Sequence, residues 1–407
     1  MQYNFKLDYM KISIVAIALL LNVIAYCIFS LKTKSWLNIL TPQFLLAMPV
    51  IFLFEFIHLS YNFEKGSDLG YLIVYLIYTL PVLAFVFSYL YVAPIKYFVN
   101  IKVDIEPSIP VTLGFLFLAV LLYLPILIQF SGDIFNPRAI YTSTRTGFGL
   151  GYYGSIVLCY IFFVLVLFNK DLPLKYKVTA LLFSIFFAYL HGSKGQILTI
   201  IFIGMMYYIV NSMVRVRFFV IIAIFLLFGV FGASIFYSMS VGIEPKDLLL
   251  IMAGYSDYSR NAVMLIDVNN HLEFGRIFFE DNFFSRIPRA IYPAKPTDYG
   301  SFELALKFFP ASFYLNEGVP SFGVGVLYAD FGLSAVFFSP VGGFLNGVVS
   351  RTLMARLRIY KNPADFILLC FMSGIVLIPI GAGNLLPEHF MLAMLILFVL
   401  KKRKSVL

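Results

Sequence analysis

The chain contains 407 residues, of which 61% are hydrophobic and 13% are charged, and its formal net charge is +9. Soluble domains carry about 25% charged residues, so this composition excludes a water-soluble globular enzyme and an intrinsically disordered chain. The three cysteines lie singly in apolar stretches, which predicts neither a disulfide framework nor a zinc site.

Apolar runs bounded by charged or turn residues follow one another along the chain. They cover residues 12–30, 37–59, 70–92, 109–130, 151–168, 174–190, 197–213, 218–240, 321–349, 366–380 and 388–400. Helices satisfy their own backbone hydrogen bonds in lipid, and about 20 apolar residues cross a bilayer. The sequence therefore predicts an all-α polytopic membrane protein with about 11 transmembrane helices, in the range of about 10–12, and a large, partly helical loop.

Three regions are expected along the chain. Residues 1–240 would form about eight spans, residues 241–320 a folded cap outside the membrane, and residues 321–407 about three further spans and a basic tail. Within the cap, residues 246–270 have helical periodicity. A loop of medium length, residues 131–146, is expected on the same side of the membrane. The sequence shows no internal repeat, which weakens the interpretation as an inverted-repeat transporter.

The distribution of lysine and arginine predicts the orientation. One alternating set of connections holds 17 basic residues and the other holds 6, if the long cap is left aside. The richer set is expected in the cytoplasm together with the C-terminus, and the cap on the outer side. The net positive charge thus records topology and does not indicate an anionic substrate. The richer set is Lys32, Lys34, Lys96, Lys102, Lys170, Lys175, Lys177, Arg215, Arg217, Arg351, Arg356, Arg358, Lys361, Lys401, Lys402, Arg403 and Lys404.

Ionisable residues are nearly absent from the middle of the expected spans and gather near their outer ends. Charges inside a membrane are costly and mark functional sites. Their placement favours a site at the outer interface, at the depth of a lipid head group, over a path through the bilayer. These residues are Glu55, His58, His191, Lys194, Asp330, Glu388 and His389, of which Glu55 and His58 are expected to form an interhelical pair.

The strongest single signal is the basic segment RIPRAIYPAKP, residues 286–296. It holds Arg286, Arg289 and Lys295, and Arg276 lies just upstream. Three prolines stiffen the segment, so its cations are presented at a low entropic cost. Because arginine binds phosphate oxygens as a fork, the pattern predicts a clamp for a pyrophosphate or an acidic sugar. The alternative is a set of interfacial cations that contact lipid head groups or nearby carboxylates such as Glu280.

Further cations lie on the same expected side. Arg138 and Arg145 in the loop 131–146 would complete the clamp, since topology requires no positive charge there. Lys194 in the turn HGSKGQ and Arg260 in the expected cap helix are further candidates for phosphate contacts. The alternative for Arg138 and Arg145 is that they are solvated loop arginines. For Lys194 it is a plain polar turn, and for Arg260 it is pairing with a neighbouring aspartate.

A general base is also expected in this region, because glycosyl transfer requires removal of a proton from the acceptor hydroxyl at about 3 Å. His271 and Glu273 are the leading candidates, and structural hydrogen bonding is the alternative for each. The other candidates are Glu280, Asp281, Glu303 and His191.

Several familiar motifs are absent or do not fit. Gly149, Gly151 and Gly154 spell G-x-G-x-x-G, but inside an apolar run with no preceding strand, which indicates close helix packing and not a dinucleotide site. The sequence contains no Walker A motif, and its first outer loop has no D-x-D pair. We therefore expect no metal, no other cofactor and no nucleic-acid partner.

These motifs together resemble the Wzy-type O-antigen and oligosaccharide repeat-unit polymerases. The resemblance rests on R-x-P-R…P-x-K-P in a late outer loop, the G-S-K-G turn, and the segment VGVLYADFGLSAVFFSPVGGFLNG, residues 324–347. Some members carry an R-x10-G pattern in two outer loops, and both Arg138 to Gly149 and Arg289 to Gly300 fit it. Lys194 stands where relatives often carry arginine, which puts a forked phosphate contact there in doubt.

The resemblance implies transfer of a growing glycan from undecaprenyl pyrophosphate onto the next lipid-linked repeat unit. The reaction would occur without metal at the periplasmic face of the bacterial inner membrane, with membrane lipids, a flippase and a chain-length regulator as partners. An O-antigen ligase-like transferase and a flippase for the same lipid remain alternatives. His271, Glu273 and Arg289 would act in catalysis, and Arg138, Arg145, Lys194, Arg260, Arg276, Arg286, Arg289 and Lys295 would bind substrate.

Overall fold

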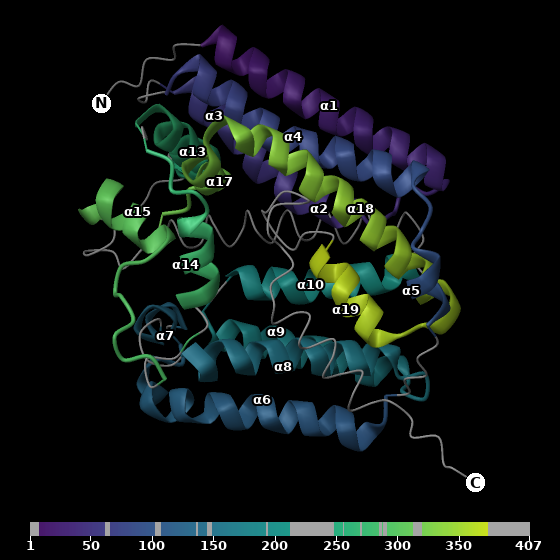
Figure 1. The fold of residues 1–407 in the computed structure, drawn as a ribbon. Coiled ribbons are helices and arrows are strands. Elements are labelled where there is room, and N and C mark those ends of the chain that lie inside the picture. Colours follow the sequence, from purple (N-terminus) through teal and green to yellow (C-terminus); the bar gives the residue numbers. More distant parts are fainter. Residues whose placement is uncertain are drawn as a thin grey trace.

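The computed structural model describes residues 8–61, 66–101, 107–135, 137–144, 149–192, 194–211, 248–254, 256–268, 271–284, 287, 291–311 and 320–372. Within these ranges all regular structure is helical, and no strand occurs. The long helices run roughly side by side in two groups, and short helices gather at one end of both groups (Figure 1). The expected all-α architecture is therefore confirmed for the described part of the chain.

The first group is built around α4 (Asp68–Tyr91), which packs against α1 (Tyr9–Thr33) on one side and α18 (Ala335–Tyr360) on another. A Cβ atom on Gly343 of α18 would lie 2.2 Å from the carbonyl oxygen of Pro81. Small residues here allow two helix backbones to touch, as they do in membrane bundles. The helical run α2 (Thr41–Met48), η1 (Pro49–Leu53) and α3 (Phe54–Ser60) completes the group, and η1 is a π-helical turn.

The second group consists of α6 (Ile109–Gln129), α8 (Gly149–Phe168), α9 (Leu174–Leu190) and α10 (Lys194–Val210). A Cβ atom on Gly151 would lie 3.0 Å from the carbonyl oxygen of Leu122, so α8 and α6 are in backbone contact there. Close helix packing is therefore confirmed for Gly151 of the glycine motif. The short helix α19 (Pro363–Met372) packs against α18, α8 and α10 and joins the two groups.

Most expected spans coincide with helices. Among the described residues, five segments are long and apolar enough to cross a membrane, namely Tyr9–Thr33, Asp68–Tyr91, Ile109–Gln129, Gly151–Phe168 and Gly325–Tyr360. Pro49–Ser60 and Gly195–Val210 are shorter apolar helices within two further expected runs. The runs 218–240 and 388–400 lie outside the described residues, and the total of about 11 spans stays a prediction.

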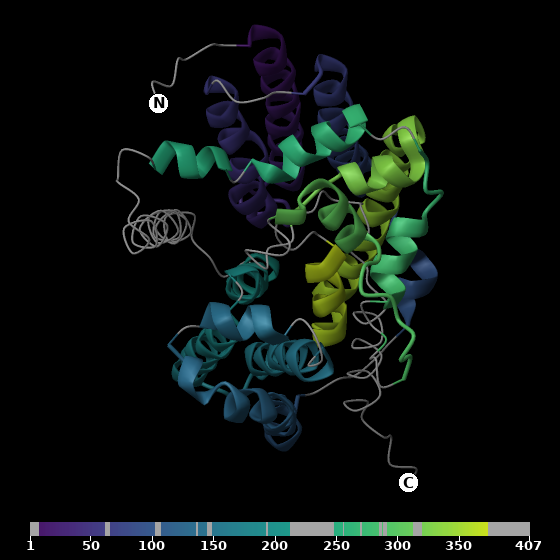
Figure 2. The ribbon, with the colours of Figure 1, turned by 90° about the vertical axis from the view of Figure 1, so that its left-hand side faces the viewer.

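The short helices of the expected cap lie together at one end of the molecule. They are α12 (Leu248–Gly254), α13 (Asp257–Val268), α14 (Arg276–Phe284) and α15 (Ser301–Phe308), with α17 (Gly325–Phe331) leading back into α18. Figure 2 shows these segments spread across the ends of the long helices. The expected helical character of 246–270 is confirmed, with a break between α12 and α13. We call this side of the molecule the cap end.

The loop expected at 131–146 contains helical structure that the sequence did not indicate. It holds the short turn η2 (Ser131–Asp133) and the helix α7 (Pro137–Thr144). Proline is favoured as the first residue of a helix because its missing N–H would be unpaired there anyway. Pro137 occupies this position in α7.

The expected end of the span 321–349 is wrong. Helix α18 continues to Tyr360, so the arginines expected in a cytoplasmic connection lie on its last turns. Arg356 is buried, and its Nε donates to both carboxylate oxygens of Asp365 at 3.0 Å. This partner allows a cation inside the packed end of the bundle. The helix α5 (Lys96–Asn100) packs beside it, at the end opposite the cap (Figure 1).

Candidate functional site

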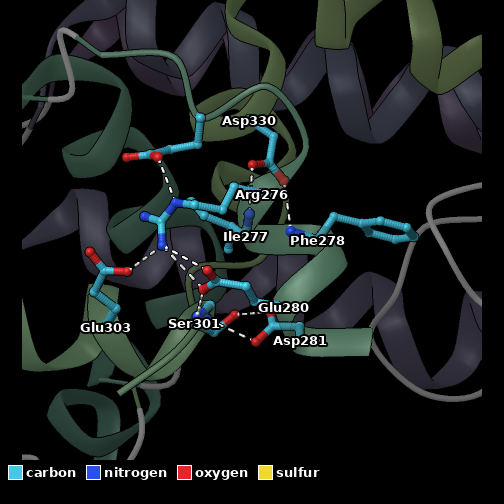
Figure 3. A network of polar contacts seen from close by, with 10 residues as sticks. Arg276, Ile277, Phe278, Glu280, Asp281, Ser301, Glu303 and Asp330 are labelled. Carbon is cyan, nitrogen blue, oxygen red and sulfur yellow. Dashed lines mark hydrogen bonds and ion pairs between the residues drawn. The ribbon is translucent and has the colours of Figure 1, made fainter. Parts of the chain in front are cut away.

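Asp330 organises the cap by holding the first turn of α14. Its carboxylate is fully buried and accepts hydrogen bonds from the backbone N–H groups of Ile277 at 3.0 Å and Phe278 at 2.8 Å (Figure 3). The N–H of Phe274 donates to the backbone oxygen of Asp330 at 2.8 Å. A carboxylate at a helix N-terminus satisfies unpaired donors and the helix dipole. The segment around Asp330 thus fixes the direction of α14.

Arg276, the first residue of α14, lies among three carboxylates. Its guanidinium donates to Glu273 at 2.8 Å, to Glu280 at 3.1 Å and to Glu303 of α15 at 2.7 Å (Figure 3). The hydrogen bond from Arg276 lowers the pKa of Glu273, and the same contacts raise the pKa of Arg276. Contact with a nearby carboxylate was the alternative expectation for this group of cations, and it is confirmed for Arg276. Its function in binding pyrophosphate stays a prediction.

Two acidic residues of α14 hold the start of α15. The backbone N–H of Gly300 donates to Glu280 at 2.8 Å, and that of Ser301 donates to Asp281 at 2.9 Å. Gly300 has φ +54°, and a Cβ atom there would lie 2.2 Å from the Asp281 carboxylate. The end of α14 and the start of α15 are therefore pinned together, and the basic segment between them forms a closed loop.

Four residues of the basic segment, Arg286, Pro288, Arg289 and Ala290, lie outside the described residues. Lys295 is described: its Nζ donates to the backbone oxygen of Ile287 at 3.3 Å and lies 5.0 Å from the ring centre of Tyr299. His271 is exposed and lies within electrostatic range of Glu273. The two leading candidates for the proton acceptor thus lie close together at the edge of the cap.

The acidic cluster around Arg276 gives a pH-dependent prediction. Because the folded-state pKa of Glu273 lies below its ordinary value of 4.5, its stabilising contribution is present above that value and is lost as the pH falls through the folded pKa. In Arg276→Met we expect this dependence to disappear and the cap to open more readily at neutral pH, since three carboxylates then repel one another. Amide hydrogen exchange of residues 271–284 measured against pH tests this.

The matched control is Lys307→Met, which removes an exposed cation whose charge contributes only weakly to the lowered pKa of Glu273 and leaves the hydrogen bond from Arg276 to Glu273 in place. Equal exchange rates in the two variants at neutral pH would contradict the prediction.

A second group of candidates surrounds the turn between α9 and α10. His191 is fully buried, its Nδ1 lies 2.7 Å from the backbone oxygen of Phe187, and its Nε2 lies 2.9 Å from the Ser155 hydroxyl. The hydroxyl of Tyr123 donates to the backbone oxygen of Leu190 at 2.7 Å. A buried ring with both nitrogens bonded has no access to an acceptor hydroxyl, so the expectation of His191 as the proton acceptor is wrong. Its contacts hold the turn.

This turn is pressed against α7. Gly192 has φ +67°, and a Cβ atom there would lie 1.9 Å from the backbone oxygen of Pro137. Arg138 follows Pro137 directly, and Lys194 lies two residues after Gly192, so the backbones of two predicted cations are close together. The side chains of Arg138 and Lys194, and all of Arg145, lie outside the described structure.

Helix α13 brings Arg260 to the same end. Tyr258 of α13 lies within electrostatic range of Tyr141 of α7, and Arg260 lies within range of Asp257 and of the buried Glu55 of α3. Pairing of Arg260 with a neighbouring aspartate was the alternative expectation, and its proximity to Asp257 supports it. Glu55 itself accepts a hydrogen bond from the hydroxyl of Tyr71 at 2.7 Å, which makes it part of an interhelical contact.

Asp257 is a candidate that the sequence did not indicate. Burial raises the pKa of this carboxyl to about 6, although the charge of Arg260 and backbone N–H groups oppose the shift. Its Oδ1 is buried and has no hydrogen-bond partner among the described residues. A carboxyl with a pKa near the working pH is suited to general-base catalysis. Only the packing of α13 produces this property, so no sequence pattern reveals it.

Within the described residues, no group of three or more His, Cys, Asp or Glu side chains is arranged to hold a metal ion. The expectation of a metal-independent reaction stays a prediction.

Comparison with known proteins identifies the family. The chain is 33% identical over 389 residues to a protein named O-antigen polymerase from Salmonella typhimurium, covering 95% of this chain and 94% of that protein. A protein of the same name from Salmonella typhi matches with the same identity and coverage. No family model and no solved structure matches the chain. Similarity of this degree over nearly the whole length, in an all-helical protein with several membrane-spanning segments, shows that the chain belongs to the O-antigen polymerase family.

Proposed function

We propose that the chain transfers a growing glycan from undecaprenyl pyrophosphate onto the next lipid-linked oligosaccharide repeat unit. The observation that carries the proposal is the 33% identity to O-antigen polymerases over 95% of the chain. The reaction takes place at the cap end, where four of the predicted substrate-binding residues lie on α7, α10, α13 and α14, namely Arg138, Lys194, Arg260 and Arg276. The cap end faces the periplasm from the inner membrane, and the C-terminus lies in the cytoplasm, because the basic connections lie at the opposite end.

The cations of the cap end hold the pyrophosphate groups of donor and acceptor lipids. Arg289 and its neighbours in the basic segment stabilise the charge that develops on the departing pyrophosphate, which is the function a metal ion serves in other transferases. The pinned junction of α14 and α15 supports this, because a loop closed at both ends presents its cations at a lower entropic cost. Arg138, Arg145, Lys194 and Arg260 contribute from the neighbouring elements.

A side chain of the cap end accepts the proton of the attacking hydroxyl. His271 and Glu273 are the candidates that the sequence indicates, but the lowered pKa of Glu273 makes it a weak base. Asp257, with its pKa raised to about 6, retains a proton affinity better suited to the step.

The assignment of Asp257 predicts a pH profile. A general base acts in its ionised form, so polymerisation should rise with pH through about 6 and then level off. In Asp257→Asn we expect a rate loss on the order of 10²- to 10⁴-fold, measured as chain growth on purified lipid-linked repeat units. Glu273→Gln serves as the matched carboxyl variant. A full loss in Glu273→Gln together with an active Asp257→Asn would move the function to Glu273.

The pyrophosphate contact is tested by Arg289→Ala. We expect this variant to reach the membrane in normal amounts but to limit lipopolysaccharide to a single repeat unit, because the leaving group loses its counter-charge. The measurement is the ladder of lipopolysaccharide bands in a strain that carries only the variant. Lys307→Ala, a neutralised cation elsewhere in the cap, should give the normal ladder. Full-length ladders with Arg289→Ala would contradict the proposal.

A reconstituted assay separates the polymerase from its two rivals. Purified protein supplied with lipid-linked repeat units should lengthen the glycan without lipid A, which a ligase-like transferase requires as its acceptor. It should do so in detergent, where a flippase has no membrane to act across. A flippase and a chain-length regulator are proposed partners in the cell, which supply the substrate and set the product length.

A further inference from the structure

Helix α14 exposes phenylalanine side chains on its outer side, while its carboxylates lie on the inner side together with the buried Ile277. Its carboxylates Glu280 and Asp281 point toward the cap interior, where they bind Arg276 and the start of α15. Its outward side carries Phe279 and Phe283, which are 59% and 44% exposed and stack at a ring distance of 5.2 Å. Surface helices in water place apolar residues inward and charges outward. The outward side of α14 is therefore suited to an apolar medium.

The turn that leads into α14 adds a third outward phenylalanine. Phe274 is 83% exposed and has φ +50°, a left-handed conformation that bulky residues rarely adopt. Hydrogen bonds on both sides hold it, from Glu273 N–H to Ala329 and from Phe274 N–H to Asp330. Strain of this kind persists where the surroundings impose it, often at functional positions. Here the strained turn displays a large apolar side chain outward.

This surface continues the exposed apolar side of α18. A Cβ atom on Gly275 would touch the ring of Phe331 at 3.3 Å, and Phe331 in turn lies 5.4 Å from the ring of Phe338. Phe337 and Phe338 are 73% and 53% exposed and belong to the membrane-spanning candidate Gly325–Tyr360. Figure 1 shows α14 running across the direction of the long helices, as a helix lying in the plane of a membrane does.

We infer that Phe274, Phe279 and Phe283 form a membrane-contact surface that inserts into the outer leaflet of the lipid bilayer. Aromatic side chains favour this depth, at the boundary between head groups and hydrocarbon. The contact anchors the cap in the plane of the membrane and sets the height of Arg276 and the basic segment at the level of lipid head groups. The anchor itself does not depend on the proposed polymerisation, and it is measured without an activity assay.

Tryptophan fluorescence tests the inference. The chain contains one tryptophan, Trp36, so Trp36→Phe provides a silent background. In this background we introduce Phe279→Trp or Phe274→Trp, with Phe337→Trp of α18 as the lipid-exposed reference and Lys307→Trp of α15 as the water-exposed reference. Each protein is reconstituted into phosphatidylcholine vesicles with bromine-labelled acyl chains, and its thermal unfolding is compared with that of the background.

We expect bromolipid to quench Phe279→Trp and Phe274→Trp as strongly as Phe337→Trp, and water-soluble iodide to quench only Lys307→Trp. Quenching of the α14 positions by iodide in place of bromolipid would overturn the inference. Protection from both quenchers would also overturn it and would indicate that a second protein chain covers the surface. If added polyprenyl phosphate abolishes the quenching by bromolipid, the inference is overturned, and the surface is a groove for the tail of the substrate lipid.

Discussion

Arg356→Ala should lower the free energy of unfolding by about 3–5 kcal/mol, because it removes one partner of a buried ion pair. Arg356 and Asp365 are 7% and 6% exposed. The guanidinium also donates to the backbone oxygens of Phe98, which lies in α5, and of Ile101, which directly follows α5. Its loss leaves a buried carboxylate and two partly buried carbonyl groups without their donor, and it separates α5 and α19 from α18. Unfolding in mixed micelles, followed by circular dichroism, measures the change.

Two companion variants make the result specific. Arg358→Ala removes an exposed arginine from the same turn of α18 and should change stability by less than about 0.5 kcal/mol. Arg356→Met combined with Asp365→Leu removes both charges and should restore much of the loss, as apolar replacement of a buried ion pair often does. If Arg356→Ala is as stable as Arg358→Ala, the ion pair is not formed in the folded protein.

Gly192→Ala is expected to damage both stability and activity. The position has φ +67°, which costs about 1–2 kcal/mol for a residue with a Cβ atom, and that atom would lie 1.9 Å from the backbone oxygen of Pro137. The turn and α7 must move apart, at a further cost of about 1–3 kcal/mol. Because Arg138 and Lys194 flank this contact, we expect shorter lipopolysaccharide ladders together with a lower unfolding temperature.

Gly114→Ala is the matched control, since a Cβ atom at this position of α6 would meet nothing within 4 Å. It should be neutral or slightly stabilising, because alanine restricts the unfolded chain more than glycine does. A normal ladder and an unchanged unfolding temperature in Gly192→Ala would mean that the turn and α7 are not in contact.

The sequence predicted the helical spans well because each span is a local pattern. An uninterrupted apolar run bounded by charges forms a helix in lipid whatever its neighbours are, and this holds for α4, α6 and α8. The end of α18 was missed because Arg356 resembles a solvated loop residue until Asp365 is placed beside it. Helix α7 was missed because eight residues carry too little periodicity to separate a short helix from a loop.

The sequence predicted which residues belong to the candidate site, but it predicted few of the contacts between them. The sequence indicated Arg276 and its nearby carboxylates as neighbours along the chain, and Glu273 and Glu280 do contact it. It indicated Glu303 only as a candidate base and not as a partner of Arg276, and it did not indicate the placement of Asp330 at the start of α14. Residues far apart in the sequence meet only through the packing of α14, α15 and α17, and single-sequence patterns carry no information on such contacts.

By itself the sequence determined that this is a helical membrane protein of the O-antigen polymerase family, because composition, run length and similarity are all properties of the linear chain. Only the tertiary structure decided the chemical character of individual side chains. Burial turned Asp257 into a carboxyl with a raised pKa, and hydrogen bonding turned His191 from a candidate base into a support for a turn. The physical reason is that proton affinity depends on solvent access and neighbouring charge, which arise when distant segments pack together.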